Sequence, residues 1–194
     1  MAIPHRAGNV SAQSGARMTI VWFLVAVVLF SAAWGSISAA PWVPTRANQR
    51  DRLFEHLKLK PGETIIDLGC GTGTLLFAAV RSYPEVIARG YEVSVLPLVF
   101  GWLHKLAGIK RHRNVSLRFG NLFRAPIQDA DTVVIFLLSS CYPRLISKLK
   151  NELKPSARVI VEAWPLPNIE PTQTIREEGL LPIFIYDAER IRGV

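Results

Sequence analysis

The sequence contains only two cysteines, Cys70 and Cys141, in 194 residues. Two cysteines are too few for a disulfide framework, and they form neither a CxxC pair nor a spacing with histidine of the kind that binds zinc. We therefore expect no metal site and no disulfide scaffold. A reducing compartment is the natural environment of such a chain.

Acidic residues are also scarce: 15 Asp and Glu stand against 23 Lys and Arg, which gives a formal net charge of +8 at pH 7. This excess of positive charge predicts an affinity for polyanions, and both nucleic acid and the anionic face of a lipid bilayer qualify. Charge alone does not choose between them. The length suits one ordinary domain with a short accessory segment.

Charged residues are missing altogether from Met18 to Thr45. Residues 18–40 are apolar over a length sufficient to cross a hydrocarbon core, which takes about 20 residues, so we predict one transmembrane helix there. The alternative is a cleaved signal peptide ending at Ser38-Ala39-Ala40. A retained anchor is favoured, because the domain that follows is expected to use a cytosolic cofactor.

The flanks of this segment predict its orientation, since Lys and Arg accumulate on the cytoplasmic side of a membrane. Residues 41–194 are therefore expected to be the cytoplasmic domain of a single-pass membrane protein. Residues 1–17 are mostly small and polar and are predicted to be a disordered tail. The flanking charges are Arg6 and Arg17 before the segment, and Arg46, Arg50, Arg52, Lys58 and Lys60 after it.

Beyond the anchor, short apolar runs alternate with helical patterns, which predicts an α/β fold with a mostly parallel, Rossmann-like sheet covered on both faces. The pattern places one helix before the first strand and allows one edge strand at Ile183–Tyr186. The expected strands are Thr64–Leu68, Ile87–Val93, Val115–Phe119, Thr132–Leu138 and Arg158–Ala163, and the expected helices are Asn48–Leu59, a segment through Leu75 and Val80, Leu96–Leu106 and Arg144–Leu153.

The most informative motif lies between the first strand and the next helix, where the sequence reads Asp67-Leu68-Gly69-Cys70-Gly71-Thr72-Gly73. Glycines let the backbone turn tightly and approach a ligand, and the helix start beyond them offers free N–H groups. A dinucleotide fingerprint would read GxGxxG and bind a diphosphate. Here an acidic residue precedes the glycines. It would repel a diphosphate and attract the ammonium of a methionine moiety, which favours S-adenosylmethionine.

Three further residues are candidates for the same cofactor. Glu92 ends the second strand, where a carboxylate can accept hydrogen bonds from both ribose hydroxyls. Asn121 and Leu122 follow the third strand, where such folds place groups against the adenine. Each has a structural alternative: a solvated carboxylate for Glu92, and an ordinary turn residue for Asn121. Cys70 is interpreted as a small residue of the turn.

Five segments carry a resemblance to a known family: Pro41-Trp-Val-Pro-Thr45, Asp67 to Gly73, Gly90-Tyr91-Glu92, Gly120-Asn121-Leu122-Phe123 and Val133-Val-Ile-Phe136. Through them the chain resembles the membrane-associated lysine N-methyltransferases that act on the mitochondrial ATP synthase c-subunit and the adenine nucleotide translocase, together with their prokaryotic relatives. The resemblance implies a hydrophobic N-terminal segment joined to a seven-strand class I methyltransferase core. It also implies S-adenosylmethionine as the cofactor and a lysine of a small membrane protein as the acceptor.

Methyl transfer to a lysine needs an acceptor site beside the cofactor. The residues suited to line it are Trp42, Pro44 and Thr45 after the membrane segment, and Tyr142 after the fourth strand, since ligands of open α/β sheets bind beyond the carboxyl ends of the strands. A lysine must lose its proton before it attacks, and apolar walls would lower its pKa. For Trp42 and Tyr142, simple packing is the alternative.

Three other functions remain open at this stage. A membrane anchor also suits a methyltransferase for a lipid-soluble small molecule, such as a quinone or a phospholipid headgroup, and a non-catalytic cofactor-binding protein would show the same motifs. A nucleic-acid methyltransferase is favoured only by charge, because no Asp/Asn-Pro-Pro-aromatic segment follows the fourth strand. The basic residues Lys105, Lys110, Arg111, Arg113, Arg118 and Arg124 fit an anionic bilayer equally well.

Overall fold

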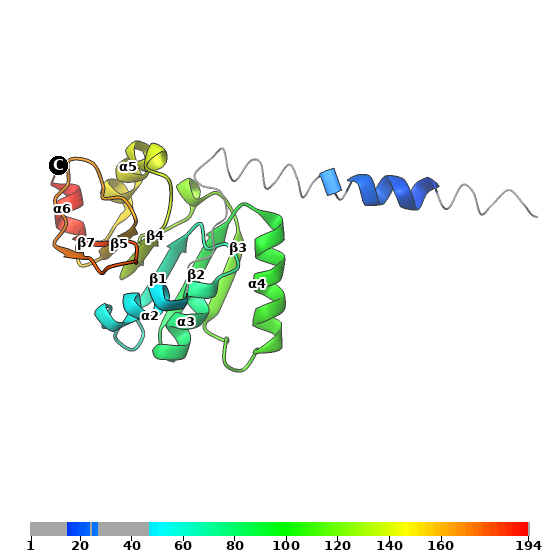
Figure 1. Cartoon of the computed structure of the whole chain (residues 1–194), viewed down its shortest axis with the longest axis horizontal. Coiled ribbons are helices and arrows are strands. Elements are labelled where there is room, and N and C mark those ends of the chain that lie inside the picture. Colours follow the sequence, from blue (N-terminus) through cyan, green and yellow to red (C-terminus); the bar gives the residue numbers. More distant parts are fainter. Residues whose placement is uncertain (1–14, 24, 27–46, 194) are drawn as a thin grey trace, which may run out of the picture.

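The computed structural model of the chain describes residues 15–23, 25–26 and 47–193 (Figure 1). Residues 15–23 and 25–26 are helical, and this helix includes residues 15–17, which were predicted to belong to a disordered tail. Within the described ranges, no helix combines the length and the apolar character needed to cross a membrane. Most of the predicted span 18–40 lies outside these ranges, so the transmembrane helix stays a prediction.

Residues 47–193 form an α/β domain around one seven-stranded sheet, with strands in the order β3-β2-β1-β4-β5-β7-β6. Strands β1 to β5 are parallel, and β7 runs antiparallel between β5 and β6. The carboxyl ends of β1 to β5 therefore share one edge, which we call the carboxyl edge. The strands are β1 (Thr64–Leu68), β2 (Ile87–Glu92), β3 (Val115–Phe119), β4 (Thr132–Ile135), β5 (Arg158–Glu162), β6 (Gln173–Ile175) and β7 (Ile183–Asp187).

Helices cover both faces of the sheet, as the sequence pattern predicted (Figure 1). On one face α2 (Ala47–His56), α3 (Thr74–Ser82) and α4 (Val95–Ala107) contribute side chains such as Leu53, Leu76 and Leu98 to an apolar core. On the other face α5 (Tyr142–Glu152) and α6 (Ala188–Arg192) contribute Leu145 and Ile191 to a second core. Two short 3₁₀ helices, η1 (Leu122–Arg124) and η2 (Ser139–Cys141), follow β3 and β4.

The observed elements differ from the expected ones mainly at their ends. The fourth strand was predicted to reach Leu138 but ends at Ile135, because its partners β1 and β5 pair with it no further than Leu68 and Val161. The last predicted strand exists but was wrongly placed at an edge, since β7 lies between β5 and β6. The edge strand β6 was missed, because its three residues are mostly exposed and show no apolar run.

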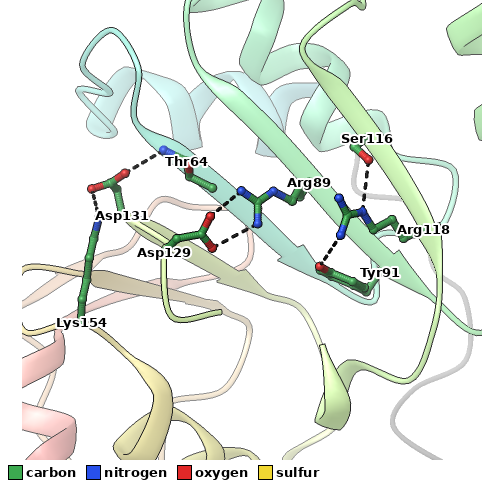
Figure 2. A network of polar contacts seen from close by, with 8 residues as sticks. All are labelled: Thr64, Arg89, Tyr91, Ser116, Arg118, Asp129, Asp131 and Lys154. Carbon is green, nitrogen blue, oxygen red and sulfur yellow. Dashed lines mark hydrogen bonds and ion pairs between the residues drawn. The ribbon is translucent and has the colours of Figure 1, made fainter. Parts of the chain in front are cut away.

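A polar network ties the amino end of the sheet to the loop before β4 (Figure 2). The Arg89 guanidinium donates to both carboxylate oxygens of Asp129, and this pairing lowers the pKa of Asp129. Asp131 accepts a hydrogen bond of 2.8 Å from the backbone N–H of Thr64 and pairs with Lys154. These contacts fix the start of β1 and leave the carboxyl edge for chemistry.

Candidate functional site

The glycine motif forms the turn that leads from β1 into α3. Gly69, Gly71 and Gly73 all have positive φ angles, of 89°, 53° and 76°, which side chains other than glycine rarely allow. The N–H groups of Gly69 and Cys70 donate to the carbonyl oxygen of Tyr91 at 2.9 and 3.1 Å. The turn is therefore shaped by its glycines and pinned to the end of β2.

Cys70 packs inside this turn. A Cβ atom at Gly90, on β2, would lie only 2.5 Å from the Cys70 Sγ atom, so the thiol fills the space that the absent side chain leaves. Burial raises the pKa of Cys70, and the nearby carboxylates of Asp67 and Glu92 act in the same direction. The thiol is therefore a packing group, which agrees with its interpretation as a small residue of the turn.

Glu92 ends β2 beside the glycine turn and is 8% exposed. One carboxylate oxygen accepts a hydrogen bond of 2.9 Å from the backbone N–H of Gly71, and the other accepts one of 2.7 Å from the N–H of Ser94. Each carboxylate oxygen has two lone pairs, so both can accept a further hydrogen bond. The carboxylate is thus held in place at the carboxyl edge, and its contact with the ribose hydroxyls stays a prediction.

Asp67 lies on the same face of the sheet as Glu92, because the register pairs it with Gly90, two residues earlier on β2. Its side chain is buried, and no hydrogen bond to it is formed by the described residues. Burial, together with the nearby carboxylates of Glu162 and Glu92, raises the pKa of Asp67 to about 8. A buried carboxylate with such a pKa lacks a cationic partner, which the ammonium of a methionine moiety would supply.

Glu162 is a third carboxylate on this face, and it was not among the residues singled out from the sequence. It ends β5, it is 0% exposed, and neither carboxylate oxygen has a hydrogen-bond partner in the described part of the chain. Burial raises the pKa of Glu162 to about 7, while Gln49 and Arg52 on α2 act in the opposite direction. Its only sequence signal was a charged residue at the end of an apolar strand.

The two polar side chains near Glu162 are only partly occupied elsewhere, because Nε and Nη1 of the buried Arg52 guanidinium have no hydrogen-bond partner among the described residues. The Gln49 side-chain amide donates to the carbonyl oxygen of Leu181 at 3.1 Å, and the Arg52 guanidinium donates to the same oxygen. Arg52 also lies 4.0 Å from the carboxylate of Glu177. The interior of this edge therefore carries three carboxylates, of which Glu162 is close to a cation without being hydrogen bonded to it.

Asn121 and Leu122 lie where the sequence predicted, directly after β3. The Asn121 side-chain oxygen accepts a hydrogen bond of 2.9 Å from the N–H of Phe123 and so caps η1. Leu122 is buried at 8% exposure. The cap explains why asparagine occurs here, and the proposed adenine contacts of both residues stay predictions.

The candidate acceptor residues are not brought together by the described structure. Trp42, Pro44 and Thr45 lie outside the described residues. Tyr142 begins α5 with a side chain that is 0% exposed, and its hydroxyl donates to the carbonyl oxygen of Trp164 at 3.0 Å. Burial raises the pKa of Tyr142. This placement favours the packing interpretation of Tyr142 over an acceptor contact.

The variant Tyr142→Phe separates these two interpretations. If Tyr142 only packs, loss of one buried hydrogen bond should lower the free energy of unfolding by about 1 kcal/mol and leave methyl transfer at a saturating acceptor concentration unchanged. Thermal unfolding and a methyl-transfer assay on the same preparation measure both quantities. A turnover reduced tenfold at unchanged stability would instead return Tyr142 to the acceptor site.

The residues of this edge fit S-adenosylmethionine. The positive φ angles of the turn require glycine, and the turn leads into the start of α3, whose first N–H groups have no partner within the helix. Asp67 offers a buried carboxylate to an ammonium, and Glu92 offers oxygens already fixed by two backbone N–H groups. Bound there, the cofactor supplies a methyl group on a sulfonium.

Comparisons with known proteins agree with this assignment. Residues 67–173 match the family model of the ANTKMT methyltransferase domain. The chain is 30% identical over 150 residues to a protein-lysine N-methyltransferase of Saccharolobus islandicus, covering 75% of this chain and 91% of that protein. It is 28% identical to the human lysine N-methyltransferase of the ATP synthase c-subunit, covering 79% of this chain and 64% of that protein.

Two further similarities bear on the fold and the cofactor. The mouse adenine nucleotide translocase lysine N-methyltransferase is 30% identical to this chain over 152 residues, which are 76% of this chain and 62% of that protein. An RNA methyltransferase of Salinibacter ruber, solved with S-adenosyl-L-homocysteine, superimposes with a TM-score of 0.70 at 26% identity. The superposition covers 75% of this chain and 94% of that one.

Proposed function

The chain belongs to the ANTKMT methyltransferase domain family and is an S-adenosylmethionine-dependent methyltransferase, and from this premise we propose that it N-methylates a lysine of a small membrane protein. The names of its relatives support the acceptor: they state lysine methylation, and two name the ATP synthase c-subunit and the adenine nucleotide translocase. The matched parts span less than two thirds of those two relatives, so the acceptor of this chain needs its own test.

The observation that carries the proposal at the site is the buried Glu162. Its carboxylate has no hydrogen-bond partner among the described residues and lies on the same sheet face as Asp67 and Glu92. These three buried carboxylates outnumber the buried Arg52 guanidinium beside Glu162, so the edge attracts a further cation. A lysine ammonium is such a cation, and so is the ammonium of an amine-bearing phospholipid headgroup, which the labelling experiment below separates from lysine; a quinone hydroxyl gains nothing from these charges.

Glu162 can also take the proton that a lysine must lose. An unperturbed lysine has a pKa near 10.4, and only its neutral amine has the lone pair that attacks a methyl group. Moving one proton from the ammonium to the Glu162 carboxylate removes both charges, and a buried environment favours the neutral pair. The pKa of Glu162, raised to about 7, suits this role better than that of an exposed carboxylate.

Membrane anchoring through residues 18–40 is part of the proposal. It is supported by the uncharged run from Met18 to Thr45 and by the excess of Lys and Arg after it, which favours a cytoplasmic domain. An enzyme tethered in this way meets its acceptor by diffusion in two dimensions. We propose a single-pass membrane protein whose domain 41–194 works at the cytoplasmic surface.

A labelling experiment tests the acceptor. Membranes from host cells that lack the protein are incubated with the full chain and methyl-labelled S-adenosylmethionine, with Asp67→Ala as the blank. We expect label in one small protein band, sensitive to protease and confirmed as methyl-lysine by mass spectrometry. The variant Glu178→Gln is the control, because it removes an exposed carboxylate from the loop between β6 and β7.

The other outcomes each identify a different function. Label that partitions into an organic extract would replace the lysine acceptor by a lipid-soluble small molecule. Label that disappears on nuclease treatment would point to RNA, which the Salinibacter ruber similarity makes worth checking. Either result would overturn the proposed acceptor while keeping the methyltransferase.

A further inference from the structure

Helix α4 is apolar on both of its sides. Its buried side carries Pro97, Leu98 and Gly101, which face the sheet. The opposite side carries large apolar residues at the spacing of one helical stripe, and these are exposed to solvent. We call this stripe the outer face of α4; it consists of Leu96, Val99, Phe100, Leu103 and Leu106, with exposed fractions of 47%, 37%, 55%, 57% and 63%.

A surface helix in water normally places polar residues on the side away from the core. The outer face of α4 breaks this rule over the whole length of the helix. Two more large apolar residues are exposed after the helix: Ile109 in the loop that follows it, at 60%, and Phe119 at the end of the edge strand β3, at 61%. Figure 1 shows α4 along the outer side of the domain, next to β3. A contiguous exposed apolar surface of this kind marks an interaction site.

The flanking charges indicate what interacts with it. From Val95 to Gln128 the sequence contains no Asp or Glu. Basic residues gather at the carboxyl end of α4, in the loop after it and on β3. Of these, Lys110, Arg111, Arg113 and Arg118 are exposed, and Lys105 is half-buried.

We propose that the outer face of α4 docks into the surface of an anionic lipid bilayer. The apolar stripe enters the boundary between headgroups and acyl chains, and the basic residues beside it meet the anionic headgroups, which is the arrangement of interfacial amphipathic helices. A polyanion such as RNA would leave the apolar stripe in water. A second copy of this chain would bring like charges together.

This docking would add a second membrane contact, distinct from the predicted anchor 18–40, and it deepens the proposed function by orienting the site. Helix α4 begins at Val95, directly after Glu92 and Ser94, so its first turn lies at the carboxyl edge. Gly101 approaches the glycine turn so closely that a Cβ there would lie 2.7 Å from the Thr72 carbonyl oxygen. A docked α4 would therefore hold the cofactor site near the bilayer, within reach of a membrane-embedded acceptor.

The test measures where single side chains of the full chain lie. The variant Leu103→Cys carries an environment-sensitive fluorophore on the outer face, and Leu181→Cys carries it at an exposed position in the loop before β7. The native Cys70 and Cys141 are buried, and the unsubstituted chain measures their background labelling. Each chain is placed in lipid discs of phosphatidylcholine alone or with phosphatidylglycerol, and quenching is measured with iodide in water and with a quencher attached to lipid.

We expect the label at position 103 to become inaccessible to iodide and accessible to the lipid quencher when phosphatidylglycerol is present, while the label at 181 stays accessible to iodide. Reversing two charges with Lys110→Glu and Arg113→Glu should raise severalfold the phosphatidylglycerol fraction at which the label at position 103 is half protected from iodide. Each basic residue near an anionic surface changes the affinity for that surface roughly fivefold. The variant Arg190→Glu, at an exposed position on α6, is the charge control.

Two results would overturn the proposal. Equal exposure of the labels at 103 and 181 to iodide in anionic discs would mean that the outer face does not dock. Protection of position 103 from both iodide and the lipid quencher, the same with and without phosphatidylglycerol, would assign the face to a protein cover, either another segment of this chain or a second copy. Binding of S-adenosyl-L-homocysteine by the same discs shows that the domain is folded, so a failure here is separate from a failure of the proposed acceptor.

Discussion

Glu92→Gln is expected to weaken the binding of S-adenosylmethionine by about 100-fold. The carboxylate accepts hydrogen bonds from the N–H groups of Gly71 and Ser94 on its two oxygens. Glutamine has one oxygen and one amide nitrogen, so one of these buried N–H groups would face a second donor. The unsatisfied donor costs roughly 1 to 3 kcal/mol of folding stability, with or without cofactor. The loss of affinity comes from the proposed contact to the ribose hydroxyls, because hydrogen bonds to a charged acceptor contribute roughly 1.5 to 3 kcal/mol and glutamine is neutral.

Calorimetric titration with S-adenosyl-L-homocysteine measures this effect. The control is Glu178→Gln, which makes the same chemical change on an exposed loop and should leave the affinity unchanged. Glu92→Asp keeps the charge and shortens the side chain, so we expect an intermediate loss. An affinity for Glu92→Gln within threefold of the unsubstituted chain would show that Glu92 shapes the turn without binding the cofactor.

Asp67→Asn is expected to stabilise the ligand-free domain at pH 8 while abolishing cofactor binding. The pKa of Asp67 is about 8 in the folded chain, against an ordinary value of 3.8. Between these two values the folded chain holds a proton that the unfolded chain has released, so the free energy of unfolding falls as the pH rises. The slope is about 1.4 kcal/mol per pH unit for one such group. Asparagine carries no charge at any of these pH values, so the substitution removes the contribution of Asp67 to the fall in the free energy of unfolding.

Thermal unfolding of the ligand-free chain at pH 5, 6.5 and 8 measures this dependence. The unsubstituted chain should lose stability across the series, and Asp67→Asn should lose less, with Glu162 accounting for the remaining slope because its pKa is raised to about 7. If the thermal stability of the two chains changed with pH in the same way, Asp67 would have an ordinary pKa in the folded chain. Asp51→Asn, at an exposed position on α2, is the matched control.

If Asp67 binds the ammonium of the cofactor, as predicted from the sequence, its raised pKa makes cofactor affinity depend on pH. Below pH 8 an ammonium that binds Asp67 must displace its proton, so affinity should rise with pH, by up to tenfold per unit. An α-amino group loses its own proton near pH 7.7 to 8. Affinity should therefore pass through a maximum near pH 8.

Helices and strands could be predicted from the sequence wherever burial of their side chains requires a run or stripe of apolar residues. Strand β1 was predicted with its observed bounds, because Ile65, Ile66 and Leu68 are fully buried and the glycines end the run. The three residues of β6 gave no such signal, and the placement of β7 inside the sheet depends on an antiparallel pairing that a short apolar run does not encode.

Part of the candidate site could be predicted from the sequence. The turn and Glu92 could be recognised, because they are close in the chain and carry distinctive residues. The setting of Glu162 could not, since Gln49 and Arg52 reach it from a helix more than a hundred residues earlier. Periodicity predicted helix α4, but with apolar residues on all sides it could not show which side the sheet covers.

The contact between Gly101 and Thr72 has a thermodynamic consequence. The helix and the cofactor turn meet there without room for a methyl group, so neither can shift without displacing the other. If lipid at the outer face of α4 changes the cofactor affinity by some factor, the cofactor must change the lipid affinity by the same factor. The residence time of the enzyme on the membrane would then depend on whether S-adenosylmethionine or S-adenosyl-L-homocysteine is bound.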